Sequence, residues 1–202
     1  MDKVPVYLLA GGKSSRFGRD KARVSFNREP LFVHAAAAVQ TVASETWVVA
    51  DTAHRYADLG LPGIADVQPG RGPLGGLEAA LNHRATQAGD GWLLLAACDM
   101  VGLEAVWLQA LLACPDAGDK PLFAAAFREE SAGRKWQPFP SLWHVSALAA
   151  VTAALAEGKE SLWRMLDALN AVAVPLPEHW TNVIQVNTPE DLDRARSRLA
   201  QP

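Results

Sequence analysis

The stretch Val4-Pro5-Val6-Tyr7-Leu8-Leu9-Ala10-Gly11-Gly12 joins an apolar run to a pair of glycines, and the chain then becomes basic as far as Lys21. The apolar run predicts a buried strand, and the glycines predict a tight turn at its carboxyl end. Glycine lets backbone N–H groups approach an anion closely, while Lys13, Arg16 and Lys21 add positive charge to the same loop. The loop is therefore predicted to bind phosphate groups. The simpler alternative is a basic surface turn, which the position after a buried strand disfavours.

Two known glycine motifs were compared with the chain. The first loop is not a Walker A loop, because Gly18 is followed by Arg19-Asp20 where that motif has Lys-Ser/Thr, so P-loop ATPase chemistry is disfavoured. Gly70-Arg71-Gly72-Pro73-Leu74-Gly75 formally matches G-x-G-x-x-G. A dinucleotide fingerprint belongs to the first strand-helix turn, whereas this pattern lies in the third unit and contains a proline. Hydride chemistry is therefore the weaker interpretation, and a tight turn followed by a helix start is preferred.

Short runs rich in Val, Leu and Ala alternate with segments of helical spacing, which predicts an α/β fold around a mostly parallel sheet. Lys135–Leu142 contains two prolines and two aromatic residues, and predicts an edge strand or an excursion over the sheet. The predicted strands are Val4–Ala10, Thr46–Ala50, Gly63–Asp66, Trp92–Ala97 and Leu122–Phe127, and the predicted helices are Pro30–Val42, Leu77–Thr86, Leu103–Leu112, Ser146–Ala156, Leu162–Leu169 and a last helix that follows Thr188 and runs through Leu199. The Thr188 hydroxyl is predicted to cap this last helix, with Pro189 at the first helical position and acidic residues in the first turn.

Length and composition limit the class of protein. The chain has 202 residues, half of them hydrophobic, and shows no repeat or linker, so one domain spanning residues 1–202 is expected. The formal charge of −3 is spread over the sequence, which gives no basic stripe for nucleic acid or an anionic membrane. The two cysteines indicate a reduced environment and packing roles. No secretory signal and no apolar run of about 20 residues occurs, so a cytoplasmic location is expected.

Aspartates follow three of the predicted strands. Ligands of an open parallel sheet gather beyond the carboxyl ends of its strands, so Asp51, Asp66 and Asp99 are expected at one edge of the sheet. Asp99 ends a strongly apolar strand and is predicted to bind Mg²⁺, which needs only one or two carboxylates besides water and phosphates. Capping of a helix that starts near Gly102 is the alternative for Asp99. Asp51 and Asp66 could instead cap turns.

Other chemistry finds little support in the sequence. The histidines show no spacing for a nucleophilic triad, and no cluster of His and Cys predicts a metal site. Trp136 and Trp143 flank Gln137-Pro138-Phe139-Pro140 and could stack on a flat heterocycle, but packing is the preferred interpretation.

Taken together, the motifs resemble the molybdenum cofactor guanylyltransferases, within the wider family of nucleotidyltransferases on a Rossmann-like α/β sheet. The resemblance runs nearly end to end, and the order and spacing of its motifs are specific. It rests on Leu9-Ala10-Gly11-Gly12, Ser15-Arg16-Phe17-Gly18, Asp20-Lys21, Gly72-Pro73-Leu74-Gly75-Gly76, Cys98-Asp99 and Val186-Asn187-Thr188-Pro189-Glu190-Asp191-Leu192.

The resemblance implies a three-layer Rossmann-like nucleotidyltransferase fold that binds GTP and Mg²⁺ and transfers GMP to the phosphate of molybdopterin, with release of pyrophosphate. It also allows for transient contact with proteins that deliver or accept the cofactor. Arg16, Lys21 and Asp99 are the implied catalytic residues, with Asp99 holding the metal. The implied GTP-binding residues are Leu9, Ala10, Gly11, Gly12, Lys21, Asp51, Asp66 and Asp99.

The chain departs from the family pattern in ways that concern the substrates. Related cytidylyltransferases resemble Leu-Ala-Ala-Gly at the first loop, so Gly11 favours the larger guanine base. The family commonly has asparagine at the positions of Asp51 and Gln185, and a proline where this chain has Met100-Val101-Gly102. Gln185 and Asn187 are the predicted acceptor contacts.

Two further interpretations of the same residues remain open. One is a related nucleotidyltransferase that uses another nucleotide such as CTP, or another phosphorylated acceptor such as a sugar phosphate. The other is a nucleotide-binding module without turnover.

Overall fold

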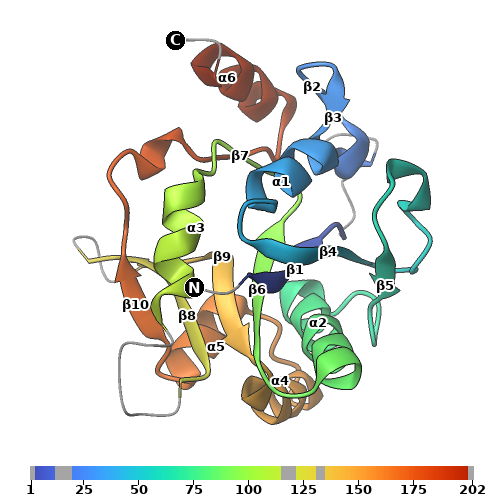
Figure 1. The fold of residues 1–202 in the computed structure, drawn as a ribbon, viewed down its shortest axis with the longest axis vertical. Coiled ribbons are helices and arrows are strands. Elements are labelled where there is room, and N and C mark those ends of the chain that lie inside the picture. Colours follow the sequence, from blue (N-terminus) through green and yellow to red (C-terminus); the bar gives the residue numbers. More distant parts are fainter. Residues whose placement is uncertain (1–2, 12–19, 115–121, 131–134, 200–202) are drawn as a thin grey trace.

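The structure, a computed structural model, describes residues 3–11, 20–114, 122–130 and 135–199. Its centre is a seven-stranded sheet with the strand order β10-β8-β9-β6-β1-β4-β5 (Figure 1). Every neighbouring pair is parallel except the two that β9 makes with β6 and β8. The seven strands are β1 Val4–Leu9, β4 Ala43–Ala50, β5 Gly63–Ala65, β6 Trp92–Ala97, β8 Ala124–Glu129, β9 Lys135–His144 and β10 Val172–Pro175.

The predicted α/β fold with a mostly parallel sheet is confirmed, and all five predicted strands are present. The second of them begins earlier than predicted, at Ala43 instead of Thr46. Pro5 is tolerated inside β1 because the register with β4 shifts between Val4 and Val6, so the ladder does not need the missing N–H group.

The prediction for Lys135–Leu142 as an edge strand or excursion is wrong, because this segment belongs to β9, which lies inside the sheet between β8 and β6. In the ladder with β8, Ala126 pairs with Ser141 and Phe127 pairs with Gln137. Pro138, Phe139 and Pro140 therefore bulge out of the ladder, and the prolines take no ladder position. The bulge explains how a proline-containing segment can occupy an interior position.

Helices cover both faces of the sheet, which makes three layers (Figure 1). Helices α1 Leu31–Val39 and α3 Ala105–Leu112 pack on one face, over buried side chains such as Leu8 and Leu94. Helices α2 Gly72–Ala88, α4 Leu148–Ala156 and α5 Leu162–Ala168 pack on the other face, where the buried Trp143 lies. Of the helices described, none has the length and apolar character to cross a membrane.

A third, smaller hydrophobic cluster joins the C-terminal helix to the carboxyl edge of the sheet. Phe26 and Leu31 pack with Ile184, Val186 and Leu192 in this cluster. The elements near this cluster are β2 Ser25–Phe26 paired with β3 Glu29–Pro30, β7 Met100–Val101 paired with β11 Ile184–Gln185, and α6 Pro189–Leu199. Elsewhere, the described chain also forms the 3-10 helices η1 Lys21–Arg23, η2 Ala57–Leu59, η4 Val145–Ala147 and η5 Trp180–Asn182.

The cap predicted for the last helix is confirmed. The Thr188 hydroxyl accepts a hydrogen bond from the Asp191 amide at 3.2 Å, and the Asp191 carboxylate accepts from the amides of Asn187 and Thr188 at 3.0 Å each. This reciprocal cap holds the backbone of Asn187, whose side chain faces the site described below.

Two glycines allow close packing near the carboxyl edge. A Cβ atom on Gly76 of α2 would lie 2.8 Å from Cδ2 of Leu9, so glycine allows the helix to approach the sheet closely at this point. A Cβ atom on Gly63 of β5 would lie 2.2 Å from the carbonyl oxygen of Ala53. The second clash is with backbone, so the segment after β4 could rest on β5 only if glycine is present there.

Replacing Gly63 by alanine is therefore expected to destabilise the fold. We expect the free energy of unfolding of Gly63→Ala to fall by about 1–3 kcal/mol, the usual cost of overpacking, as measured by urea denaturation. Ala65→Ser, at an exposed position of the same edge strand, is the matched control and should stay within about 0.5 kcal/mol of the wild type. Equal stability of Gly63→Ala and the wild type would show that the Ala53 carbonyl does not fix this approach.

Candidate active site

A pocket of about 530 Å³ opens at the carboxyl edge of the sheet. It contains the residues that follow β1, β5 and β6, so the predicted convergence of Gly11, Asp66 and Asp99 on one place is confirmed. The pocket is lined by Leu9, Gly11, Lys21, Val49, Asp66, Gly70, Gly72, Pro73, Gly76, Ala97, Cys98, Asp99, Phe139, Gln185 and Asn187.

Asp99 is the most deeply buried carboxylate of the pocket, with 5% of its surface exposed. Its Oδ2 atom forms an ion pair with Nζ of Lys21 and accepts a hydrogen bond from Nε2 of Gln185 at 3.4 Å. Lys21 also donates to Oδ1 of Asn187 at 2.9 Å. Three parts of the chain that are distant in sequence thus meet at one buried charge.

The backbone explains how these side chains come together. The Val186 amide donates to the Asp99 carbonyl at 2.9 Å, and β11 pairs with β7 immediately after Asp99. This pairing carries Gln185 and Asn187 over the end of β6. Helix α3 begins at Ala105 behind Glu104, so Asp99 does not cap that helix and the alternative role considered for it is excluded.

The second carboxylate oxygen of Asp99 has no hydrogen-bond partner among the residues described. An unpartnered buried carboxylate oxygen is costly, so this atom is suited to a donor or a cation that enters the pocket. In the described part of the chain, no group of three or more His, Cys, Asp and Glu side chains could hold a metal ion. A metal bound here would accordingly rest on Asp99 and on ligands that the substrate supplies.

Asp66 also lines the pocket, and it follows β5, whereas Asp99 follows β6. In the strand order β6-β1-β4-β5, the strand that Gly11 follows, β1, lies between these two strands. Burial, followed by the negative charge of Asp51, raises the pKa of Asp66. The raised pKa shows that the charged form of Asp66 is destabilised in the protein alone. A hydrogen-bond donor of a ligand would stabilise this carboxylate. The pocket therefore presents one acidic group after β5, another after β6, and the backbone of Gly11 after a strand between them.

Other predicted site residues lie beside the pocket or outside the described chain. Asp51 is half-exposed, pairs with Nη1 of Arg55 at 2.9 Å and does not line the pocket, so its contact with a nucleotide stays a prediction. Ala10 is buried, and its amide donates to the carbonyl of Val49 at 2.9 Å. Gly12 and Arg16 lie outside the described residues.

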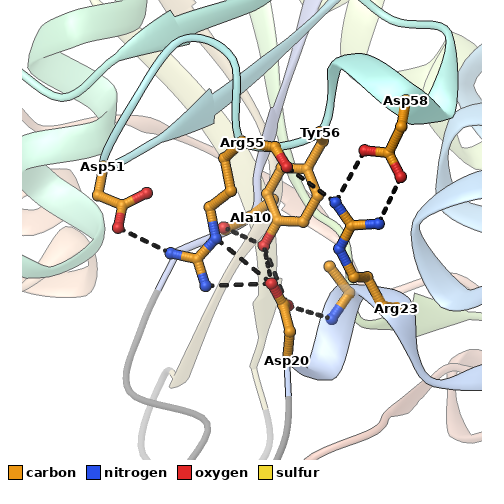
Figure 2. Close-up of polar contacts among 8 residues, drawn as sticks. Ala10, Asp20, Arg23, Asp51, Arg55, Tyr56 and Asp58 are labelled. Atoms are coloured by element: carbon orange, nitrogen blue, oxygen red, sulfur yellow. Dashed lines mark hydrogen bonds and ion pairs between the residues drawn. The ribbon is translucent and has the colours of Figure 1, made fainter.

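Sequence patterns had not assigned a role to Tyr56, Arg55 or Asp20, which form a hydrogen-bonded cluster beside the pocket (Figure 2). Two sequence signals pointed to this cluster: Asp20 belongs to the Asp20-Lys21 motif, and Arg55 and Tyr56 follow the second strand at the same edge of the sheet as the other polar residues. Phe139 was also missed as a pocket residue, because the bulge that exposes it could not be foreseen.

Cys98 precedes Asp99 and lines the pocket, but it is a buried free cysteine. Burial, with the negative charge of Asp99, raises the pKa of the Cys98 thiol to about 12. A neutral thiol is a poor nucleophile, so the site gives no support for a covalent cysteine intermediate. Trp136 and Trp143 are both buried, which confirms packing over ligand stacking.

Several known proteins are similar to this chain. A probable molybdenum cofactor guanylyltransferase of Opitutus terrae is 32% identical over 200 residues, covering 96% of this chain and 95% of that protein. One from Deinococcus radiodurans is 35% identical over 195 residues, covering 95% and 93%. The molybdenum cofactor guanylyltransferase of Yersinia pseudotuberculosis is 30% identical over 189 residues, covering 92% and 91%.

The fold is shared with solved structures. Molybdopterin-guanine dinucleotide biosynthesis protein A from Archaeoglobus fulgidus superposes with a TM-score of 0.80 at 23% identity, covering 98% of this chain and all of that one. The family model described as the MobA-like NTP transferase domain matches residues 6–173. With its sheet, its pocket and these relatives, the chain belongs to the MobA-like NTP transferase family, the nucleotidyltransferases that include the molybdenum cofactor guanylyltransferases.

Proposed function

We propose that this protein transfers the GMP group of GTP to the phosphate of molybdopterin, giving the guanine dinucleotide form of the cofactor and pyrophosphate. The observation that carries the proposal is the buried Asp99 carboxylate, which lines the pocket. One of its oxygens pairs with Lys21, and the other has no hydrogen-bond partner among the residues described. The names of the relatives support this choice of donor and acceptor.

Different residues of the pocket are proposed to bind the nucleotide and the acceptor. In the proposal, the nucleoside lies over Leu9, Gly11 and Asp66, where backbone and one desolvated carboxylate are available for base or ribose. The triphosphate extends toward Lys21 and Asp99. The acceptor phosphate enters from the side of Gln185 and Asn187, whose amides lie against the same charged pair. This order brings the acceptor next to the α-phosphate of the donor.

The proposed metal is Mg²⁺ at Asp99. The donor set fits, because Oδ1 of Asp99 is a carboxylate oxygen without a hydrogen-bond partner in the described part of the chain, and Mg²⁺ is typically held by one or two carboxylates with water and phosphate oxygens. When bound, the ion would neutralise negative charge on the triphosphate.

The transfer itself needs no group of the protein to become bonded to the substrate. An oxygen of the acceptor phosphate bonds to the α-phosphorus as the bond from that phosphorus to the bridging oxygen of pyrophosphate breaks. Lys21, together with the predicted contribution of Arg16, would stabilise the charge on the oxygens of the transition state and the leaving pyrophosphate. Lys21 is shared between Asp99 and Asn187, and these contacts hold its ammonium group where the triphosphate is proposed to lie.

Substrate choice is tested by incubating the protein and Mg²⁺ with molybdopterin and each of GTP, CTP and ATP in turn. Pyrophosphate is expected with GTP only, together with the guanine dinucleotide product. Equal turnover with CTP would overturn the base assignment, and turnover with a sugar phosphate in place of molybdopterin would overturn the acceptor assignment. A protein that binds GTP without turnover of any acceptor would be a binding module.

The role of Asp99 is tested with Asp99→Asn, which keeps the size of the side chain and removes its charge. Turnover is expected to fall by about 100-fold or more, the range found when one preorganised charge-stabilising group is lost. Asp193→Asn, an exposed carboxylate of α6, is the control and should keep full activity. Pyrophosphate release measured over a range of Mg²⁺ concentrations checks the result, and unchanged metal dependence in Asp99→Asn would rule out Asp99 as the ligand.

Gly11 is expected to select the base. Among the residues described, no atom lies within 4 Å of a Cβ atom placed on Gly11, so Gly11→Ala should fold normally and place a methyl group in the pocket. We expect kcat/KM for GTP to fall by about 10-fold or more, with a smaller loss for the smaller base of CTP. Steady-state kinetics with both nucleotides measure this ratio, and an unchanged ratio would refute a base-selecting role for Gly11.

A further inference from the structure

Tyr56 contacts Ala10 and Asp20, which lie in the sequence on either side of the glycine-rich segment of residues 11–19. Its phenolic oxygen lies 3.0 Å from the carbonyl oxygen of Ala10, and 3.0 and 2.9 Å from Oδ1 and Oδ2 of Asp20 (Figure 2). Tyr56 is buried, with 3% of its surface exposed. One hydroxyl group, carried by the segment after β4, therefore contacts both the end of β1 and the residue before Lys21.

Asp20 is held by more than Tyr56. Its Oδ1 accepts from the Ala22 amide at 3.1 Å, and its Oδ2 accepts from Nε and Nη2 of Arg55 at 3.3 and 3.1 Å. The same guanidinium reaches Asp51 through Nη1 at 2.9 Å. Arg55 thus bridges two carboxylates, one of which belongs to the turn that carries Lys21.

A second set of hydrogen bonds holds the chain on the other side of Lys21, at Arg23. Arg23 donates to both carboxylate oxygens of Asp58 at 2.6 and 2.8 Å, and to the carbonyl oxygen of Arg55 at 2.9 Å. Asp20 and Arg23 are consequently both attached to the segment of residues 51–58 (Figure 2). Lys21 lies between these two attachments, and its ammonium group reaches Asp99 and Asn187 on the opposite side of the pocket.

We propose that Tyr56 is a positioning residue for the transfer: by sharing its one hydroxyl proton between the Ala10 carbonyl and the Asp20 carboxylate, it fixes where Lys21 stands relative to Asp99. The functional consequence rests on the proposed nucleotidyl transfer, in which Lys21 acts on the phosphates. Arg55 binds the same Asp20 carboxylate as Tyr56, and neither of the two residues lines the pocket.

The surroundings of Tyr56 keep its hydroxyl group a hydrogen-bond donor and its ring packed in one position. Burial, and then the hydrogen bond with Asp20, raise the pKa of Tyr56, so the phenol keeps its proton and remains a donor. The ring stacks on Phe32 of α1 with centroids 5.6 Å apart, and the guanidinium carbons of Arg23 and Arg55 lie 5.3 and 5.4 Å from its centroid. Phenylalanine can keep these ring contacts and lose only the hydrogen bonds.

Tyr56→Phe therefore isolates the proposed role from packing. The matched control is Tyr7→Phe, because Tyr7 is also buried and its hydroxyl has one described partner, Nδ1 of His83 at 2.8 Å, away from the pocket. Both variants lose a phenolic hydroxyl from the core, so a merely structural effect would appear in both. Thermal unfolding of the two variants measures that shared effect.

The first readout needs no substrate. The rate at which an acylating reagent labels Nζ of Lys21, followed by peptide mass spectrometry, reports how firmly the amine is held at Asp99. We expect labelling of Lys21 to be about 5- to 10-fold faster in Tyr56→Phe, the change that corresponds to loss of one hydrogen bond, and unchanged in Tyr7→Phe. Equal labelling in Tyr56→Phe and the wild type overturns the proposal, whatever the substrate proves to be.

The second readout is kinetic and separates the inference from the proposed function. In Tyr56→Phe, kcat/KM for GTP should fall about 5- to 10-fold, while KM for the acceptor stays that of the wild type. In a Lys21→Met background, adding Tyr56→Phe should cause no further loss, because Tyr56 acts through Lys21. Fully additive losses overturn the proposal, whereas a wild type that turns over no nucleotide contradicts the proposed function and leaves the labelling result to decide the role of Tyr56.

Discussion

The ion pair between Lys21 and Asp99 is the interaction on which the rest of the site depends. It joins the turn after β1 to the end of β6, and Asn187 adds the segment before α6. A buried charge pair of this kind is stable only if both groups are precisely held. The structure meets this requirement with the β7–β11 pairing on one side and the Tyr56 cluster on the other.

The sheet provides the frame for this arrangement. Because β1, β4, β5 and β6 are parallel neighbours, their carboxyl ends open on one edge, and the residues after three of them line a single pocket. The antiparallel strand β9 adds a side chain from the opposite direction, since its bulge exposes Phe139 to the same pocket. Close packing at Gly76 brings α2 against Leu9, and both of these residues line the pocket.

Local sequence patterns predicted the pocket residues that come directly after strands. Gly11, Asp66 and Asp99 each come just after an apolar run, so the general behaviour of parallel sheets was enough to bring them together. Phe139 could not be foreseen, because two prolines indicate an edge strand unless the partner strand shows that they lie in a bulge. The pairing of Asp51 with Arg55, away from the pocket wall, likewise depends on side-chain neighbours that no spacing reveals.

The sequence by itself determined the α/β class, the five predicted strands, the cap of the last helix and the family motifs, because these depend on local periodicity, turn residues and short-range hydrogen bonds. Only the tertiary structure decided which groups meet. Lys21 and Asn187 are far apart in the chain, and Tyr56 is separated from both Ala10 and Asp20, yet hydrogen bonds join them. The physical reason is that such contacts depend on the packing of elements around the sheet, and burial then makes it costly to leave a polar group without a partner.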